Sequence, residues 1–198
     1  MKYLNLALFL LLLCSCYAIS NEEIRFLCDK EQFQLLSKYE ESIQVKVNQG
    51  NMEDLKTVLD YAHRADRKDL AKECHKHLAS DLHSLEDALQ WLLLSETEEV
   101  DSVSFSADFN TITEAITDSL DRTVWLYYTK RCSEEELSAK IASAAKYNPI
   151  VEAMAKDLVD EISIERSDSL ALELLNEFET RYPKSQYRSI ALYYKLYN

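Results

Sequence analysis

Histidine and cysteine side chains form the one cluster in this sequence whose types suit a metal ion. The cluster is Cys74-His75-Lys76-His77, with His63 and His83 nearby. Two metal ligands on one helix have to share a face, as residues four apart do. His75 and His77 are two apart and therefore point about 200° apart around a helix. The pattern predicts solvated histidines on a helical surface, with no metal site.

Carboxylates are the other side chains that could act as acids, bases or cation ligands. They concentrate at positions 96–101 and 134–136. A catalytic pair must lie in a cleft with its two pKa values driven apart, and no spacing here indicates one. The first run has no glycine for the sharp turn of a calcium loop, and the chain has no Gly-x-Ser-x-Gly nucleophile elbow. The sequence therefore predicts a non-enzyme without catalytic residues or cofactors.

The N-terminus has the pattern of an export signal. Lys2 precedes an apolar run over residues 6–13, which is short of the ~20 residues needed to cross a bilayer. We therefore expect cleavage and export to the periplasm or cell surface.

The end of that apolar run offers two cleavage sites. Leu13-Cys14-Ser15-Cys16 resembles a bacterial lipobox. This resemblance implies that residues 1–15 are a signal peptide, that Cys16 carries the lipid of an outer-membrane lipoprotein, and that residues 16–22 form its tether. The alternative is ordinary signal-peptidase cleavage after Ala18.

Three cysteines remain beyond the N-terminal segment, namely Cys28, Cys74 and Cys132. They are widely spaced in apparently helical, partly apolar stretches. Small buried hydrophobic side chains are the favoured interpretation, and one disulfide with a free thiol is the alternative.

One glycine and two prolines among 198 residues point to an all-α protein. Glycine supplies the left-handed turns of hairpins and the close backbone approach of phosphate loops. Its scarcity argues against β-sandwiches, barrels, Rossmann folds and P-loops. The formal charge of −13 argues against nucleic acid as a partner, because phosphates need Lys and Arg. We expect contact with a membrane only through the lipid anchor.

Helix-start and helix-stop residues recur along one all-helical domain at 23–198. The acidic, serine-rich stretch 95–106 lacks a helical period and is predicted to be a loop or linker, and residues 112–128 resume the helical period. Capping boxes are predicted at Ser20–Glu23 and Ser133–Glu136. Further helix starts are predicted at Asp66, at Ser84–Asp87 and at Asn148-Pro149, and a helix end at Gly50-Asn51.

The last segment, residues 167–198, carries a more specific pattern. It contains Phe178, then Tyr182-Pro183-Lys184-Ser185-Gln186-Tyr187, then Ala191, Tyr194 and Tyr197. This resembles the tetratricopeptide-like repeats of bacterial outer-membrane assembly lipoproteins, which often read Phe, Tyr-Pro-x-Ser-x-Tyr, Ala and a Tyr pair. The resemblance implies antiparallel helix pairs in a right-handed solenoid. An irregular helical bundle is the other interpretation.

Aromatic residues are the best candidates for a binding role. Tyr187, Tyr194 and Tyr197 surround the last helix and could form a partner-contact surface, since Tyr is enriched at interfaces. The leading hypothesis is a lipid-anchored, non-catalytic interaction or scaffolding module of a bacterial cell envelope, whose partners are envelope proteins or peptides. The alternative is a secreted helical bundle that binds a small apolar ligand between helices near Trp125.

Overall fold

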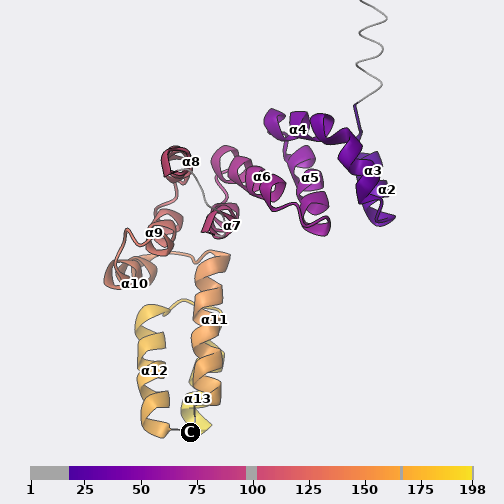
Figure 1. The fold of residues 1–198 in the computed structure, drawn as a ribbon. Coiled ribbons are helices and arrows are strands. Elements are labelled where there is room, and N and C mark those ends of the chain that lie inside the picture. The colour runs from indigo at the N-terminus through magenta and orange to yellow at the C-terminus, as the bar shows by residue number, and fades with distance from the viewer. Residues whose placement is uncertain (1–17, 97–101, 166, 198) are drawn as a thin grey trace, which may run out of the picture. The chain divides into compact units, whose positions relative to one another are not determined.

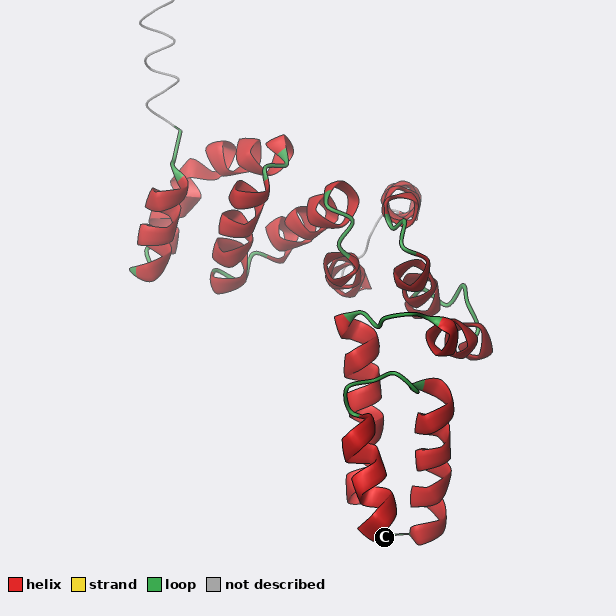
Figure 2. Cartoon of the chain, turned by 180° about the vertical axis from the view of Figure 1, so that it is seen from behind, coloured by secondary structure: helices red, strands yellow, loops and turns green. Residues whose placement is uncertain are grey.

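The computed structural model describes residues 18–96, 102–165 and 167–197 (Figure 1). These residues are 79% helical and none of them lies in a strand, so the all-α prediction is confirmed (Figure 2). The predicted signal peptide at 1–15 and the predicted lipid-attachment residue Cys16 lie outside the described residues. Within the described ranges, no helix is both long and apolar enough to cross a membrane.

The chain divides into two compact units, Met1–Ala115 and Ile116–Asn198. Helices of the first unit are α2 (Asn21–Asp29), α3 (Phe33–Leu36), the 3-10 helix η1 (Ser37–Tyr39), α4 (Glu40–Gln49), α5 (Met52–Arg64), α6 (Lys68–Asp81), α7 (Leu85–Glu96) and α8 (Ser102–Ala115). Helices of the second unit are α9 (Ser119–Tyr128), α10 (Glu134–Ser143), α11 (Pro149–Ile164), α12 (Asp168–Arg181) and α13 (Arg188–Tyr197).

In the first unit, helices that are close in sequence pack on one another. Helix α5 contacts α2, α4 and α6, and α6 also contacts α7 and α8. Helix α5 has apolar residues spaced along one face, and Leu55, Val58 and Ala62 are all buried. One apolar face per helix is enough to form a continuous core in such an arrangement.

The fold begins earlier than the predicted tether allows. Ile19 is only 4% exposed, and its backbone N–H donates to Ser42 Oγ at 3.0 Å. Ser20 and Glu23 form the predicted capping box of α2. The interpretation of 16–22 as a tether is therefore wrong for residues 19–22, because an apolar side chain and a helix cap fix them to the unit.

The linker predicted at 95–106 is wrong at both ends. Helix α7 continues to Glu96, and α8 begins at Ser102. The ring of Phe105 stacks on that of Trp91 with centroids 5.2 Å apart, so the serine-rich segment has an apolar contact that holds it as a helix. Positions 97–101 lie outside the described residues, and the boundary between units falls between Ala115 and Ile116 instead.

The helices of the second unit form one connected set. Helix α10 contacts both α9 and α12, and α11, α12 and α13 contact one another; α11 and α12 lie side by side in Figure 1. Ser133 and Asn148 cap α10 and α11 as predicted, with Pro149 at the first position of α11. The helical period predicted over 112–128 is divided between α8 and α9, because Asp118 accepts hydrogen bonds from two backbone N–H groups and starts α9 as a new helix.

Left-handed residues end several helices in this glycine-poor chain. Gly50 follows α4 with φ of 66°, as predicted. Asp66 also has a positive φ, 52°, and the N-cap position of α6 is occupied by Arg67, so the prediction of Asp66 as a cap is wrong. The same left-handed backbone is found at three more residues other than glycine, Glu31, His83 and Lys130.

Candidate functional site

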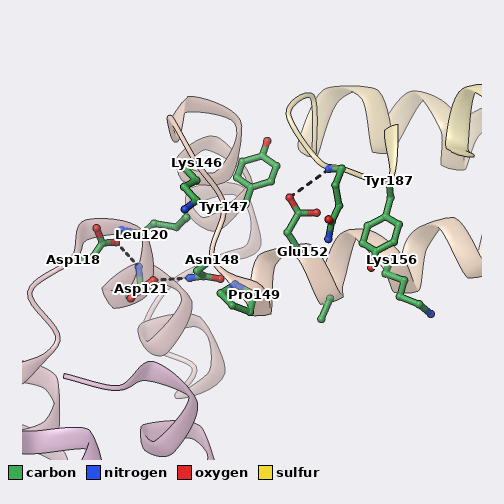
Figure 3. A pocket seen from close by; sticks show the side chains of 12 residues that line it. Asp118, Leu120, Asp121, Lys146, Tyr147, Asn148, Pro149, Glu152, Lys156 and Tyr187 are labelled. Carbon is green, nitrogen blue, oxygen red and sulfur yellow. Dashed lines mark hydrogen bonds between the residues drawn. The ribbon is translucent and has the colours of Figure 1, made fainter. Parts of the chain in front are cut away.

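A pocket of about 740 Å³ opens on the surface of the second unit (Figure 3). This is within the range of roughly 300–1,000 Å³ that ligand pockets occupy. Three stretches of chain line it: the start of α9, the connection into α11 with its first turns, and the connection between α12 and α13. The lining residues are Asp118, Leu120, Asp121, Lys146, Tyr147, Asn148, Pro149, Glu152, Ala153, Lys156, Gln186 and Tyr187.

Asn148 joins the first two stretches. Its side-chain Oδ1 accepts from the backbone N–H of Val151 at 2.8 Å, which caps α11. Its Nδ2 donates to Asp121 Oδ1 at 2.6 Å, and Asp121 lies in the first turn of α9. One amide therefore fixes the start of α11 against the start of α9, as Figure 3 shows.

Glu152 holds the third stretch. One of its carboxylate oxygens accepts from Ser185 Oγ at 2.7 Å, and the other accepts from the backbone N–H of Gln186 at 3.4 Å. Ser185 is buried, and the neighbouring Lys184 donates its backbone N–H to the hydroxyl of Tyr147 at 3.4 Å. The connection that carries Tyr187 is thus held on the N-terminal turn of α11.

Besides the carboxylates that accept hydrogen bonds within the walls, the charged side chains of the pocket are the lysines Lys146 and Lys156. Lys146 is exposed and has no carboxylate partner among the residues that the structure describes. Lys156 pairs with Asp160 at 2.5 Å, and that hydrogen bond raises the pKa of the ammonium group. The rings of Tyr147 and Tyr187 supply apolar area. The pocket can therefore hold an apolar side chain and place an acidic group beside Lys146.

The three predicted contact tyrosines have different environments. Tyr187 lines the pocket, where Figure 3 shows its ring beside Lys156. Tyr194 lies on α13, is half-buried and meets the ring of Tyr193 edge-on at 5.8 Å. The side chain of Tyr197 lies outside what the structure describes. Of the two tyrosines whose side chains the structure describes, Tyr187 lines the candidate site and Tyr194 does not.

Sequence reasoning missed Lys146 and Glu152 as site residues. The signal for part of the site was present, because Asn148-Pro149 correctly marked the start of α11. No local pattern marked Glu152, whose partners are 33 and 34 residues away. Trp125, the centre of the alternative ligand hypothesis, is fully buried and does not line this pocket.

The histidine cluster is also different from its prediction. His75 is 4% exposed and not solvated, because α7 covers it and Asp87 Oδ1 lies 2.7 Å from its Nδ1. The ring of His63 lies 5.6 Å from that of His75. Among the residues that the structure describes, no three His, Cys, Asp or Glu side chains are placed to hold a metal ion.

The described cysteines are free thiols. Cys28 and Cys74 are fully buried, in agreement with the hydrophobic interpretation, while Cys132 is half-exposed. Burial raises the pKa of the Cys74 thiol to about 12, which keeps it protonated at neutral pH.

Comparison of the chain with protein-family models, with curated proteins and with solved structures finds no match in any of the three.

Proposed function

We propose that this protein is a non-catalytic interaction module of a bacterial cell envelope, anchored through Cys16, whose second unit binds a peptide segment of an envelope protein. The observation that carries the proposal is the pocket that presents Tyr187 and Lys146 on a wall fixed by Asn148 and Glu152. A pre-formed wall favours binding, since less conformational freedom is lost when the partner docks.

The chemistry of the pocket indicates the kind of segment. Two tyrosine rings with Leu120 and Pro149 suit an apolar side chain, and Tyr is frequent at interface hot spots. The ammonium group of Lys146, which has no carboxylate partner in the described chain, suits a carboxylate next to that side chain. The segment we propose therefore carries an apolar residue beside an acidic one.

Site-specific photo-crosslinking in the intact envelope tests this proposal. A benzoylphenylalanine placed at the exposed, pocket-lining Gln186 should give one discrete crosslinked product. Tyr187→Ala and Lys146→Glu should each reduce that product at least fivefold. The same photo-reactive residue at Glu161, an exposed position of α11 outside the pocket, is the matched control. A product of equal yield in Tyr187→Ala would refute the pocket as the contact surface.

The anchor has its own test. The mass of the mature N-terminal peptide should show a diacylated or triacylated Cys16. A mature chain that begins at unmodified Ile19 would refute the anchor and support cleavage after Ala18. Both products retain Ile19, whose side chain is buried in the first unit.

A further inference from the structure

A second hollow on the second unit, between α10 and α12, has a different chemistry from the pocket described above. It has a volume of about 570 Å³ and is lined by Glu134, Glu135, Ser138, Ala139, Ala142, Asn176, Glu177, Thr180 and Arg181. None of these residues lines the pocket of Tyr187. We call this hollow the α10–α12 groove.

Beyond Glu134 and Glu135 at the start of α10, the side chains that this helix presents to the groove are small. Ser138, Ala139 and Ala142 succeed one another at the spacing of one helix face. Small residues let the backbone of an incoming segment approach the helix closely. An extended or helical segment can therefore lie along α10, where larger side chains would keep it away.

The groove is lined by three carboxylates and one guanidinium, so negative charge exceeds positive charge. Arg181 is held between two carboxylates, with Nη1 2.9 Å from Glu134 Oε1 and 3.3 Å from Glu177 Oε1. Its side chain is only 12% exposed, and its guanidinium lies over the ring of Tyr182 at 5.6 Å. Arg181 is therefore a fixed part of the wall.

A third carboxylate, Glu135, remains outside this arrangement. It is exposed, and it has no Lys or Arg partner within the described parts of the chain. Hydrogen bonds from its own backbone N–H and from the Ser133 hydroxyl lower the pKa of its carboxyl group. Together with Glu134 and Glu177 it gives the groove more negative than positive charge.

We infer that the α10–α12 groove is a second interaction surface, which binds a lysine- or arginine-bearing segment of a partner protein along Ser138, Ala139 and Ala142 and pairs its cation with Glu135. Charge complementarity selects this occupant, because an acidic segment would meet three carboxylates around a guanidinium that is already paired. The inference does not depend on the function proposed for the pocket of Tyr187.

Fluorescence anisotropy with a fluorescein-labelled 12-residue peptide of Lys, Ala and Leu tests this inference on the mature chain. The lysine peptide should bind, and its counterpart with Glu in place of Lys should not. Glu135→Gln should weaken binding about fivefold, and Ala139→Trp, which fills the groove, at least tenfold. Tyr187→Ala should leave binding of the probe unchanged, which separates this surface from the other pocket.

Two matched variants control for charge and bulk. Glu161→Gln removes the same charge from an exposed position of α11, and Ile164→Trp adds a ring at a position that is 77% exposed. Both should bind the lysine peptide within twofold of the unsubstituted chain, and circular dichroism should show that all variants remain folded. Equal weakening by Glu135→Gln and Glu161→Gln, full binding by Ala139→Trp, or no binding of the lysine peptide at 1 mM would each overturn the inference.

Discussion

Removing the carboxylate of Asp87 is expected to destabilise the first unit strongly. His75 is 4% exposed, and its Nδ1 lies 2.7 Å from Asp87 Oδ1. Its Nε2 is buried without a hydrogen-bond partner among the described residues. In Asp87→Ala both ring nitrogens of a buried imidazole would lack a protein partner, and the pair that joins α6 to α7 would be lost.

The magnitude follows from two contributions. A buried polar group that loses its hydrogen bond costs about 1–3 kcal/mol. Asp87 also accepts from the Ser84 hydroxyl at 2.5 Å, and Asp87→Ala would remove this hydrogen bond. The backbone N–H of Asp87, which donates to Ser84 Oγ at 3.2 Å, would remain. Loss of the hydrogen bond between the Ser84 hydroxyl and the carboxylate costs roughly 1 kcal/mol more. We therefore expect the free energy of unfolding to fall by about 2–4 kcal/mol.

Urea unfolding followed by tryptophan fluorescence measures this change in one unit at a time. The chain has two tryptophans, Trp91 in the first unit and Trp125 in the second. In a Trp125→Phe background, the fluorescence of the buried Trp91 reports the first unit alone. The matched control is Asp81→Ala, which breaks the exposed His77–Asp81 pair of the same helix at 3.1 Å and should cost less than about 0.5 kcal/mol.

A second substitution separates the buried imidazole from other effects. Adding His75→Leu to Asp87→Ala replaces both partners by apolar groups and should recover at least about 1 kcal/mol. If Asp87→Ala costs no more than Asp81→Ala, or if the double variant is the less stable one, the reasoning about the buried pair is wrong.

The pH dependence has a definite sign. Burial raises the pKa of the Asp87 carboxyl, but hydrogen bonds from His75 and Ser84 outweigh burial, so its pKa in the folded protein is lowered. A lowered pKa adds stability that is complete above the unfolded-state pKa, near 3.9, and that is lost as pH falls through the folded-state pKa. The stability difference between the unsubstituted chain and Asp87→Ala should therefore shrink below about pH 4.

The left-handed residues and the thiols give three further expectations. Gly50→Ala should destabilise the first unit by about 1–2 kcal/mol in the urea assay, because a Cβ at φ of 66° is strained and would lie 3.2 Å from Asp81 Oδ2. Lys130→Gly should instead stabilise the second unit by about 0.5–1 kcal/mol, because the φ of 59° at Lys130 is strained for a residue with a Cβ and not for glycine. The fluorescence of Trp125 reports this change, and a loss of stability would contradict the strain argument. At pH 8 iodoacetamide should alkylate the half-exposed Cys132 at least tenfold faster than Cys74, because burial raises the pKa of the Cys74 thiol to about 12. Peptide mass mapping measures the two rates, and equal rates would refute the burial of Cys74.

Helix starts were predictable from sequence because their chemistry is local. The Ser133 hydroxyl accepts from the backbone N–H of Glu136, and Glu136 accepts from that of Ser133, so both partners lie within four residues. Asn148 was found for the same reason. Asp66 was assigned to the wrong element, because an aspartate can cap a helix or end the preceding one in a left-handed conformation. With so little glycine in the chain, the left-handed role fell to other residues.

The two proposed binding surfaces were not predictable because distant residues build them. Asn148 and Asp121 are 27 residues apart, and Tyr147 and Lys184 are 37 apart, so neither contact leaves a pattern in a short window. Tyr187 was identified only because tyrosine is frequent at interfaces. Lys146 carries no distinguishing neighbour in sequence, and its interest comes only from its position on the pocket wall.

The acidic residues of the second unit show why net charge alone says little about function. Asp118, Asp121 and Glu152 all line the pocket of Tyr187, yet each accepts hydrogen bonds from the chain itself and so acts as part of a wall. Glu135 in the α10–α12 groove accepts from the Ser133 hydroxyl and its own backbone N–H, so, unlike Asp121 and Glu152, it joins no second stretch of chain through these bonds. Its carboxylate is exposed and has no basic partner in the described chain. A catalytic pair would need two carboxylates facing one cleft with their pKa values driven apart. Asp121 and Glu152 fix the wall of the pocket of Tyr187, and Glu135 adds an exposed charge to the α10–α12 groove, which favours the two proposed surfaces: one that offers Lys146 to an acidic group and one that offers Glu135 to a basic group.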